Sequence, residues 1–222
     1  MKNFIIIVSF IFLTGCYYAN DGGPETLSNY PSITTMKDAY WSTTALNRVY
    51  CTNGTIAFTG DSRIHFINLS AAFDEQICNV ALGMTKINYV VSQYENIRDM
   101  HSKKLFIAIG TNNLKEDRPM NDLLAEYQSM VKLYKGLQPG TRLYFQCVLP
   151  FGHPSSRYPD REEKAEEFNA GIKNICDAQG VEYIDIYTFF IGHPEYYIYD
   201  GVHLSQAGKV KYAELIQSYV DE

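Results

Sequence analysis

Five short apolar runs alternate along the chain with longer segments of helical period, and this alternation limits the possible folds most. The predicted strands are Thr55–Gly60, Gln76–Val80, Lys104–Gly110, Thr141–Leu149 and Val181–Ile186. The predicted helices are Arg63–Ala72, Thr85–Met100, Met120–Leu137, Arg161–Gln179 and Ser205–Val220. Strands that alternate with helices of this length predict an α/β fold of three layers, in which helices cover both faces of a five-stranded parallel sheet.

The first fifteen residues are predicted to be an export signal and not part of the fold. Lys2 supplies a positive charge, and the run from Phe4 to Leu13 is apolar except for Ser9. A run of that length is too short to cross a bilayer as a helix. The sequence Leu-Thr-Gly-Cys that ends at Cys16 resembles the lipobox of bacterial lipoprotein precursors, in which cleavage leaves an N-terminal Cys that carries lipid. The resemblance implies that Cys16 is the lipidated first residue of the mature protein.

A lipid on Cys16 would anchor the protein to a membrane of the bacterial cell envelope. Tyr17 follows this Cys where many inner-membrane lipoproteins carry Asp, so we expect the outer membrane in a cell that has one. Two alternatives are an ordinary secretory signal that contains a Cys, and a buried first helix. Residues 16–43 are rich in Gly, Pro, Asn, Ser and Thr and are predicted to be a tether, which leaves 44–222 as the folded domain.

Length and charge limit the number of domains and the class of partner. The 222-residue chain without its leader has enough residues for one sizeable core and few for two. Its 25 Asp and Glu residues outnumber the 19 Lys and Arg residues, which argues against duplex nucleic acid as a partner. The sequence does not indicate an oligomeric state.

Export changes the interpretation of the cysteines, because thiols outside the cytoplasm meet an oxidising environment. Cys78 and Cys147 fall inside apolar runs, where a free Cys packs as a small hydrophobe, so we expect at most one disulfide among the cysteines beyond Cys16. No CxxC motif or Cys/His ligand spacing is present, and no metal site is predicted. The other histidines outside the last loop are expected on the surface or in loops: His65, His101, His153 and His193.

Polar residues follow three of the predicted strands, at the edge where parallel sheets bind ligands. Ser62 stands at the turn from the first strand to the first helix, and Asn112 follows the third strand. Asp200 and His203 lie three residues apart on a Gly-containing loop before the last helix. A Ser beside an Asp-oriented His can act as a nucleophile, and an Asn amide can donate to an oxyanion. Each residue alone also fits a structural role as a helix cap, turn residue or surface residue.

Together these segments resemble the SGNH hydrolases, also called the GDSL family. The resemblance covers Ile56 to Tyr219. It rests on Gly-Asp-Ser ending at Ser62, Gly-Thr-Asn-Asn from Gly110 and Asp-Gly-Val-His-Leu from Asp200. It also includes Leu149-Pro150, Phe168-Asn169-Ala170 and Ile184-Asp185-Ile186-Tyr187. The family implies a flavodoxin-like three-layer fold, with Ser62 as nucleophile, His203 as general base and Asp200 as the residue that orients the His. It further implies an oxyanion hole formed by the Ser62 N–H, the Gly83 N–H and the Asn112 side chain.

Two departures from the family pattern affect this assignment. The second block has one residue fewer before its second Gly, so a gapless alignment on Asn79 places Met84, and not Gly83, at the backbone donor position. Gly83 is favoured because Gly tolerates a tight turn, although either residue supplies an N–H. Asn113 replaces the Asp that commonly follows Asn112, and this change is expected to affect local hydrogen bonds more than chemistry.

The resemblance implies hydrolysis of carboxylic esters through an acyl-enzyme, without metal or organic cofactor. Small-molecule or glycan esters are the expected substrates, with short acyl groups preferred because no lid-forming insertion is evident. Tyr196, Tyr197, Tyr199 and Arg63 are candidate contacts to the alcohol part of the substrate. The alternatives are a carbohydrate O-acetylesterase and, in another class, a non-catalytic lipid-anchored surface binding protein.

Overall fold

A computed structural model describes residues 51, 54–137, 140–153 and 159–222. The predicted leader, Cys16 and the predicted tether lie outside the described residues. All strand pairs in the sheet are parallel, and the spatial order is β2-β1-β3-β4-β5. The five predicted strands are confirmed with shorter bounds: β1 Ile56–Gly60, β2 Ile77–Asn79, β3 Lys104–Ala108, β4 Arg142–Gln146 and β5 Glu182–Ile184. The order reverses between β1 and β3, and such a switch point is where α/β sheets place their ligand crevice.

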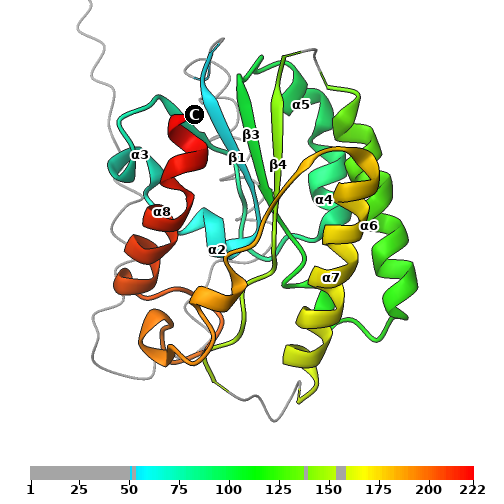
Figure 1. Ribbon diagram of the computed structural model, residues 1–222, viewed down its shortest axis with the longest axis vertical. Coiled ribbons are helices and arrows are strands. Elements are labelled where there is room, and N and C mark those ends of the chain that lie inside the picture. Colours follow the sequence, from blue (N-terminus) through cyan, green and yellow to red (C-terminus); the bar gives the residue numbers. More distant parts are fainter. Residues whose placement is uncertain (1–50, 52–53, 138–139, 154–158) are drawn as a thin grey trace, which may run out of the picture.

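Helices cover both faces of the sheet, as the alternation predicts (Figure 1). One face carries α2 Ser62–His65, α3 Leu69–Ala72 and α8 Gln206–Asp221. The other carries α4 Ile87–Ser92, α5 Tyr94–Arg98, α6 Met120–Lys135 and α7 Arg161–Gln179. Short 3₁₀ turns complete the connections: η3 Asn113–Lys115, η4 Tyr187–Phe189 and η5 Pro194–Tyr196. Among the described residues, no helix is long and apolar enough to span a membrane.

Two predicted helices are interrupted, and the prediction of single helices was wrong for both. The segment Arg63–Ala72 divides into α2 and α3 because the Asn79 Nδ2 donates to the Ile64 carbonyl at 3.0 Å and to the Ile67 carbonyl at 3.3 Å. These carbonyls would otherwise accept bonds from the next helical turn. The segment Thr85–Met100 breaks at Gln93, whose N–H bonds to Val90 in a tighter turn.

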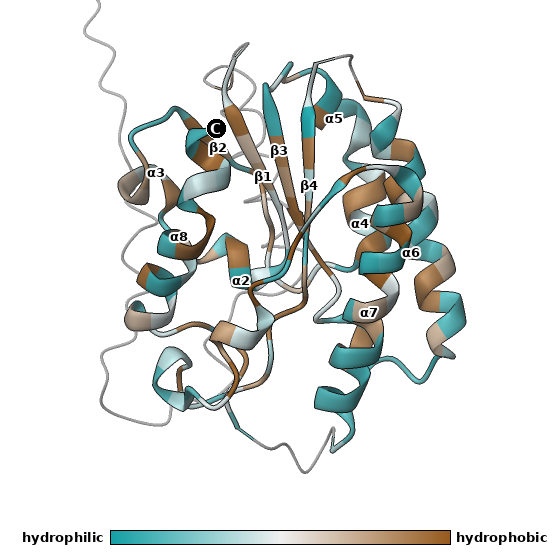
Figure 2. Ribbon diagram, in the orientation of Figure 1, coloured by the Kyte–Doolittle hydropathy of each residue, from teal (hydrophilic) through white to brown (hydrophobic). Residues whose placement is uncertain are grey.

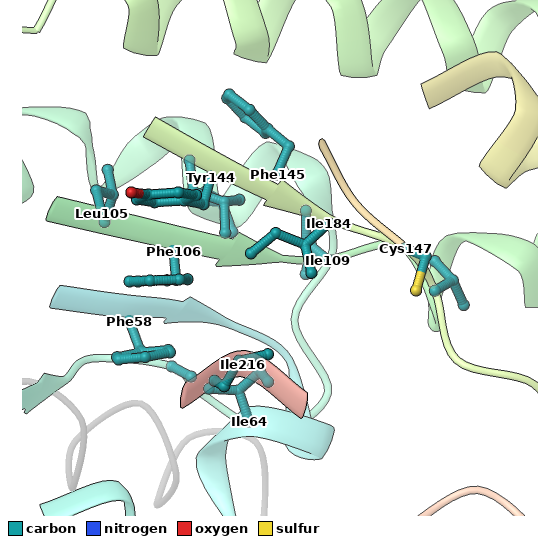
Figure 3. Packing of buried hydrophobic residues seen from close by; sticks show 14 of the residues in the cluster. Phe58, Ile64, Leu105, Phe106, Ile109, Tyr144, Phe145, Cys147, Ile184 and Ile216 are labelled. Carbon is teal, nitrogen blue, oxygen red and sulfur yellow. The ribbon is translucent and has the colours of Figure 1, made fainter. Parts of the chain in front are cut away.

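Aromatic side chains dominate the core on the α8 face of the sheet. Parallel pairing places Phe58, Phe106 and Tyr144 in register on adjacent strands. Their rings stack with centroids 4.5 Å apart in both pairs (Figure 3). Phe145, the next residue along β4, points to the opposite face and meets Tyr127 of α6. Figure 2 shows apolar residues gathered on the strands and hydrophilic residues on the outer helix surfaces.

β1 and β3 come very close together at their carboxyl ends, and Gly60 makes this possible. Gly60 has φ 154°, and a Cβ at this position would lie 2.1 Å from the Ala108 carbonyl oxygen. The Asp61 N–H then bonds to the same carbonyl. The backbone of the nucleophile turn is thereby attached to the end of the neighbouring strand.

The cysteines correct one detail of the sequence prediction. Cys78 is not free but forms a disulfide with Cys51, whose Cα lies 5.9 Å away. The bond joins β2 to the segment before β1 and is buried, so an apolar neighbourhood suits the cystine as well as a thiol. Cys147 is free and buried, as expected, and Cys176 is also free. Within the described residues this gives one disulfide.

Candidate active site

The nucleophile candidate lies directly after β1, at the first position of α2. The helix cap is Asp61 and not Ser62, because the Asp61 Oδ1 accepts the Arg63 N–H at 3.0 Å. The Ser62 hydroxyl is therefore not used as a cap. The Ser62 N–H has no intrahelical acceptor, as expected at a helix start, and none among the other described residues. Its donor remains available to a bound group.

The last loop brings Asp200 and His203 to Ser62. The His203 Nε2 lies 2.9 Å from the Ser62 Oγ, and the His203 Nδ1 lies 2.5 Å from the Asp200 Oδ2. The side chains of His203 and Asp200 are 25% and 27% exposed, so the pair is open on one side to small molecules. Residues separated by 141 positions in the sequence thus form one chain of hydrogen bonds.

Hydrogen bonds keep the Asp200 carboxylate ionised and in place. Its Oδ1 accepts the N–H groups of Val202 at 2.8 Å and His203 at 2.9 Å. Burial by itself raises the pKa of Asp200, but the hydrogen bond and charge of His203 and these two N–H donors outweigh it, so the pKa is lower than usual. An ionised Asp200 can hold a proton on the Nδ1 of His203, leaving Nε2 to accept from Ser62.

The backbone around this loop is held on both sides. The Ile198 N–H donates to the His203 carbonyl at 2.9 Å, and Tyr197 pairs with Leu204 in an antiparallel bridge. Ser205, the cap residue of α8, lies two residues after His203, and its hydroxyl accepts the Gly208 N–H at 3.2 Å. The His is therefore fixed between a bridge and a capped helix.

Arg63 is a structural residue of the site, which corrects its prediction as a substrate contact. Its side chain is buried, and its Nε donates to the Val202 carbonyl at 3.0 Å. Its Nη1 donates to the Leu149 carbonyl, and its Nη2 donates to the Pro150 carbonyl at 3.0 Å. The guanidinium also lies over the Phe151 ring. The sequence signal that could have indicated this role is the position of Arg63, directly between the nucleophile candidate and the apolar Ile64.

Asn112 lies at the carboxyl end of β3 and beside the turn that holds Gly83 and Met84. Its Nδ2 donates to the Thr85 carbonyl at 3.0 Å, and its Oδ1 accepts from the Lys115 Nζ at 3.0 Å. Neither the Gly83 nor the Met84 N–H has an acceptor among the described residues, so both stay candidates for the backbone donor. Gly83 was favoured because Gly tolerates a tight turn, but the residue of this turn with a left-handed conformation is Met84, with φ 64°.

Asn113, which stands where the family commonly has Asp, forms local hydrogen bonds. Its Oδ1 accepts the Ile87 N–H at 3.1 Å at the start of α4, and its Nδ2 is 3.5 Å from the Glu116 Oε2. The oxygen thus occupies an acceptor role that an Asp could also fill. The Asn113 amide thereby links the segment after β3 to α4, the helix that follows β2.

The remaining polar candidates divide between surface and interior. His101, His153 and His193 are exposed, as expected, but His65 is part-buried on α2, with its Nδ1 2.8 Å from the Ala81 carbonyl. Burial lowers the pKa of His65, against the effect of that hydrogen bond. Among Tyr196, Tyr197 and Tyr199, only Tyr199 is exposed, at 62%; Tyr197 is buried in the core, which corrects its prediction as a substrate wall. No group of three or more metal-ligand side chains occurs in the described part of the chain.

The family model of GDSL-like lipases and acylhydrolases matches residues 59–210, which is more than half of the chain. The chain belongs to this family. The matched range runs from the end of β1 into α8 and contains Ser62, Asn112, Asp200 and His203. As a member of the GDSL family, the protein is a carboxylic ester hydrolase of the SGNH type.

Solved structures of other proteins share the fold. A proposed platelet activating factor from Streptococcus pneumoniae is 22% identical, with a TM-score of 0.73, over 85% of this chain and 94% of that one. A proposed acylhydrolase from Bacteroides fragilis is 16% identical, with a TM-score of 0.70, over 86% and 98%. A carbohydrate acetylesterase from Sinorhizobium meliloti is 13% identical, with a TM-score of 0.64, over 76% and 99%. No curated protein matches the sequence.

Proposed function

We propose that Ser62 is the nucleophile of a two-step ester hydrolysis, with His203 as general base and acid and Asp200 as its orienting carboxylate. The observation that carries the proposal is the hydrogen-bond chain from the Ser62 Oγ through His203 to Asp200. His203 takes the Ser62 proton as the Oγ attacks the ester carbonyl, and it then gives that proton to the leaving alcohol. In the second step His203 takes a proton from water, and the resulting hydroxide attacks the acyl-enzyme carbonyl. His203 then returns the proton to the Ser62 Oγ as the bond between the acyl group and Oγ breaks and the acid leaves.

The developing oxyanion is stabilised by N–H donors that follow β1, β2 and β3. The Ser62 N–H and the second Nδ2 hydrogen of Asn112 are two of them, and the N–H of Gly83 is the preferred third, with Met84 as the alternative. Loss of one such donor typically costs about 2.7–4 kcal/mol of transition-state stabilisation. Asn112→Ala is therefore expected to lower kcat by roughly 10²–10³-fold.

Ser62→Ala tests the assignment against the non-catalytic alternative. The variant should lose esterase turnover and labelling by a fluorophosphonate, because both need the Oγ nucleophile, while its circular dichroism spectrum stays that of the wild type. Ser129→Ala, an exposed serine on α6, is the matched control and should keep both activities. A folded Ser62→Ala variant that hydrolyses esters normally would exclude Ser62 as the nucleophile.

We further propose that esters of short acyl groups, about two to six carbons, are the preferred substrates. The connection between β3 and α6 is only the segment Ile109–Pro119, too short for a lid. A long acyl chain needs a continuous apolar groove, since each buried methylene contributes roughly 0.8 kcal/mol. The values of kcat/KM on p-nitrophenyl esters from acetate to palmitate should peak at short chains. A rise that continues beyond eight carbons would indicate an acyl groove and a lipase.

Carbohydrate O-acetyl esters are the second candidate substrates. Two structural neighbours support this candidate: the Sinorhizobium meliloti carbohydrate acetylesterase and an acetyl-xylooligosaccharide esterase of a Geobacillus species. Exposed Tyr199, next to Asp200, is a side chain on which a sugar ring could stack. Acetate release from an acetylated oligosaccharide, measured beside fatty-acid release from a lysophospholipid, separates the two ester classes.

Attachment to a membrane through lipid on Cys16 is also proposed, with location in the cell envelope and, where present, the outer membrane. The lipobox-like sequence before Cys16 supports the proposal. Two acyl chains give stable attachment where one gives only marginal binding. Cys16→Ser should abolish incorporation of a fatty-acid analogue, and labelling that persists in this variant would contradict the anchor.

A further inference from the structure

The orientation of the Asn112 amide is determined by two groups of opposite kind. An ammonium can only donate hydrogen bonds and a carbonyl can only accept them. The Lys115 Nζ lies 3.0 Å from the Asn112 Oδ1, and the Thr85 carbonyl lies 3.0 Å from the Asn112 Nδ2. A flipped amide would set its N–H groups against the ammonium and its oxygen against the carbonyl. Together Lys115 and Thr85 therefore select the orientation in which Nδ2 keeps one hydrogen for another acceptor.

The local backbone explains why Lys115 reaches Asn112. Residues Asn113–Lys115 form the 3₁₀ turn η3, for which Asn112 is the cap residue. In a 3₁₀ helix, side chains three residues apart lie one above the other. Leu114 and Asn113 are only 2% and 1% exposed, so the turn is packed against the protein interior. The sequence Asn-Asn-Leu-Lys thus places an ammonium directly over the amide of its first residue.

The charged groups near Lys115 are those of the candidate active site. Although the residue as a whole is exposed, partial burial of its ammonium lowers the pKa of Lys115. The positive charges of Arg63 and Arg161 lower this pKa further, and the carboxylates of Asp61 and Asp200 oppose them. Lys115 therefore belongs to the same electrostatic environment as the Ser62 turn and the Asp200 loop.

We propose that Lys115 is a positioning residue for oxyanion stabilisation, which acts by holding and polarising the Asn112 amide. A cation at the Asn112 Oδ1 withdraws electron density from the amide, and this strengthens Nδ2 as a donor in a partly desolvated site. The inference rests on the proposed role of Asn112, which has its own test in Asn112→Ala.

Steady-state kinetics on triacetin, followed by titration of the released acid, test this proposal. Lys115→Met should lower kcat about tenfold with KM changed less than twofold, because the donor strengthens in the transition state and not in substrate binding. Lys115→Arg, which keeps a cationic donor, should keep at least half of the activity. Lys86→Met is the matched control: Lys86 pairs with Glu116 at 2.5 Å, and its loss should leave kcat within twofold of wild type.

A double-mutant cycle and a pH profile separate positioning from a general structural effect. In an Asn112→Ala background, Lys115→Met should cause no further loss, because there is no amide left to polarise. The wild-type kcat should fall at alkaline pH as Lys115 loses its proton, at a pH below the usual lysine range. This fall should be absent in Lys115→Met and should move to higher pH in Lys115→Arg.

Two results would overturn the proposal for Lys115. One is a Lys115→Met variant whose kcat, and whose fall in kcat at alkaline pH, are the same as those of wild type. The other is an undiminished effect of Lys115→Met in the Asn112→Ala background. These outcomes differ from failure of the proposed function, which would appear as an active Ser62→Ala variant or an unimpaired Asn112→Ala variant.

Discussion

At the scale of single residues, the Arg63 guanidinium connects the nucleophile turn to two loops that are distant in sequence. It donates to the carbonyls of Leu149 and Pro150 after β4 and to that of Val202 beside His203. Arginine suits this position because its planar group presents donors in several fixed directions, which a lysine ammonium cannot do. The residue after the nucleophile thereby determines where the base of the same site lies.

Arg63→Ala is expected to lower the free energy of unfolding by about 3 kcal/mol, because three buried carbonyls lose a charged donor. Arg63→Lys should recover part of this loss and still lower kcat at least tenfold, since the Val202 carbonyl and with it His203 are held less well. Urea unfolding and kcat measured well below the transition report the two effects. Arg98→Ala, a change at an exposed ion pair, is the control and should alter neither. An Arg63→Lys variant with normal kcat would show that Arg63 does not position His203.

The lowered pKa of Asp200 makes a prediction about acid stability. A carboxyl whose pKa is lower in the folded state than in the unfolded state stabilises the fold above the unfolded value. That stabilisation disappears as the pH falls from about 3.8 through the lower folded value. Thermal melts between pH 2 and 6 should therefore show a steeper acid loss for wild type than for Asp200→Asn. Parallel acid curves for the two proteins would contradict the role of these hydrogen bonds.

At the scale of elements, the carboxyl ends of β1 and β3 set the geometry of the crevice. β1 ends in Gly60 and β3 ends at Ala108, and a Cβ on Gly60 would lie 2.1 Å from the Ala108 carbonyl oxygen. A strand pair that diverged earlier would separate the Ser62 turn from Asn112. The close approach explains why short strands place both groups at one edge.

Gly60→Ala is expected to destabilise the protein by about 3 kcal/mol, because its Cβ would overlap a backbone carbonyl that cannot rotate away. The matched control is Gly180→Ala at the end of α7, where φ is also positive and the space is open. That change should cost about 1 kcal/mol, the cost of the left-handed conformation alone. Chemical denaturation of both variants measures the difference. Equal losses would show that β1 and β3 can separate without cost.

At the scale of the whole molecule, the Cys51–Cys78 disulfide attaches the segment before β1 to the edge strand β2. β2 has only three residues and pairs on one side alone, so it has few ladder bonds of its own. The disulfide closes a loop with a sequence separation of 27 and reduces the entropy of the unfolded chain.

The double variant Cys51→Ser/Cys78→Ser should be less stable than wild type by about 2–4 kcal/mol. A reductant should destabilise wild type by a similar amount and leave the double variant unchanged, since Cys147 and Cys176 are free thiols. Thermal unfolding with and without dithiothreitol tests both statements. A wild-type protein indifferent to reductant would mean that the bond contributes nothing to the native fold.

Periodicity in the sequence was sufficient to predict the layers and the five parallel strands. The resemblance to the GDSL family singled out Ser62, Asn112, Asp200 and His203, and the structure joins Ser62, His203 and Asp200 by hydrogen bonds. The periodic patterns are local: an apolar run predicts its own strand, and parallel strands all direct their carboxyl ends to one edge. The bounds of α7 were predicted exactly as observed for the same reason, because its period is continuous over nineteen residues.

Tertiary contacts decided the rest. The break between α2 and α3 depends on Asn79, which is far along the chain from Ile64, and the pairing of Cys78 depends on where Cys51 lies. The buried contacts of Arg63 and the hydrogen bond from Lys115 to Asn112 likewise could not be predicted from the sequence alone. Periodicity reports which face of an element is apolar, whereas a hydrogen bond or disulfide depends on distances between elements. Those distances exist only once the sheet has brought its strands together.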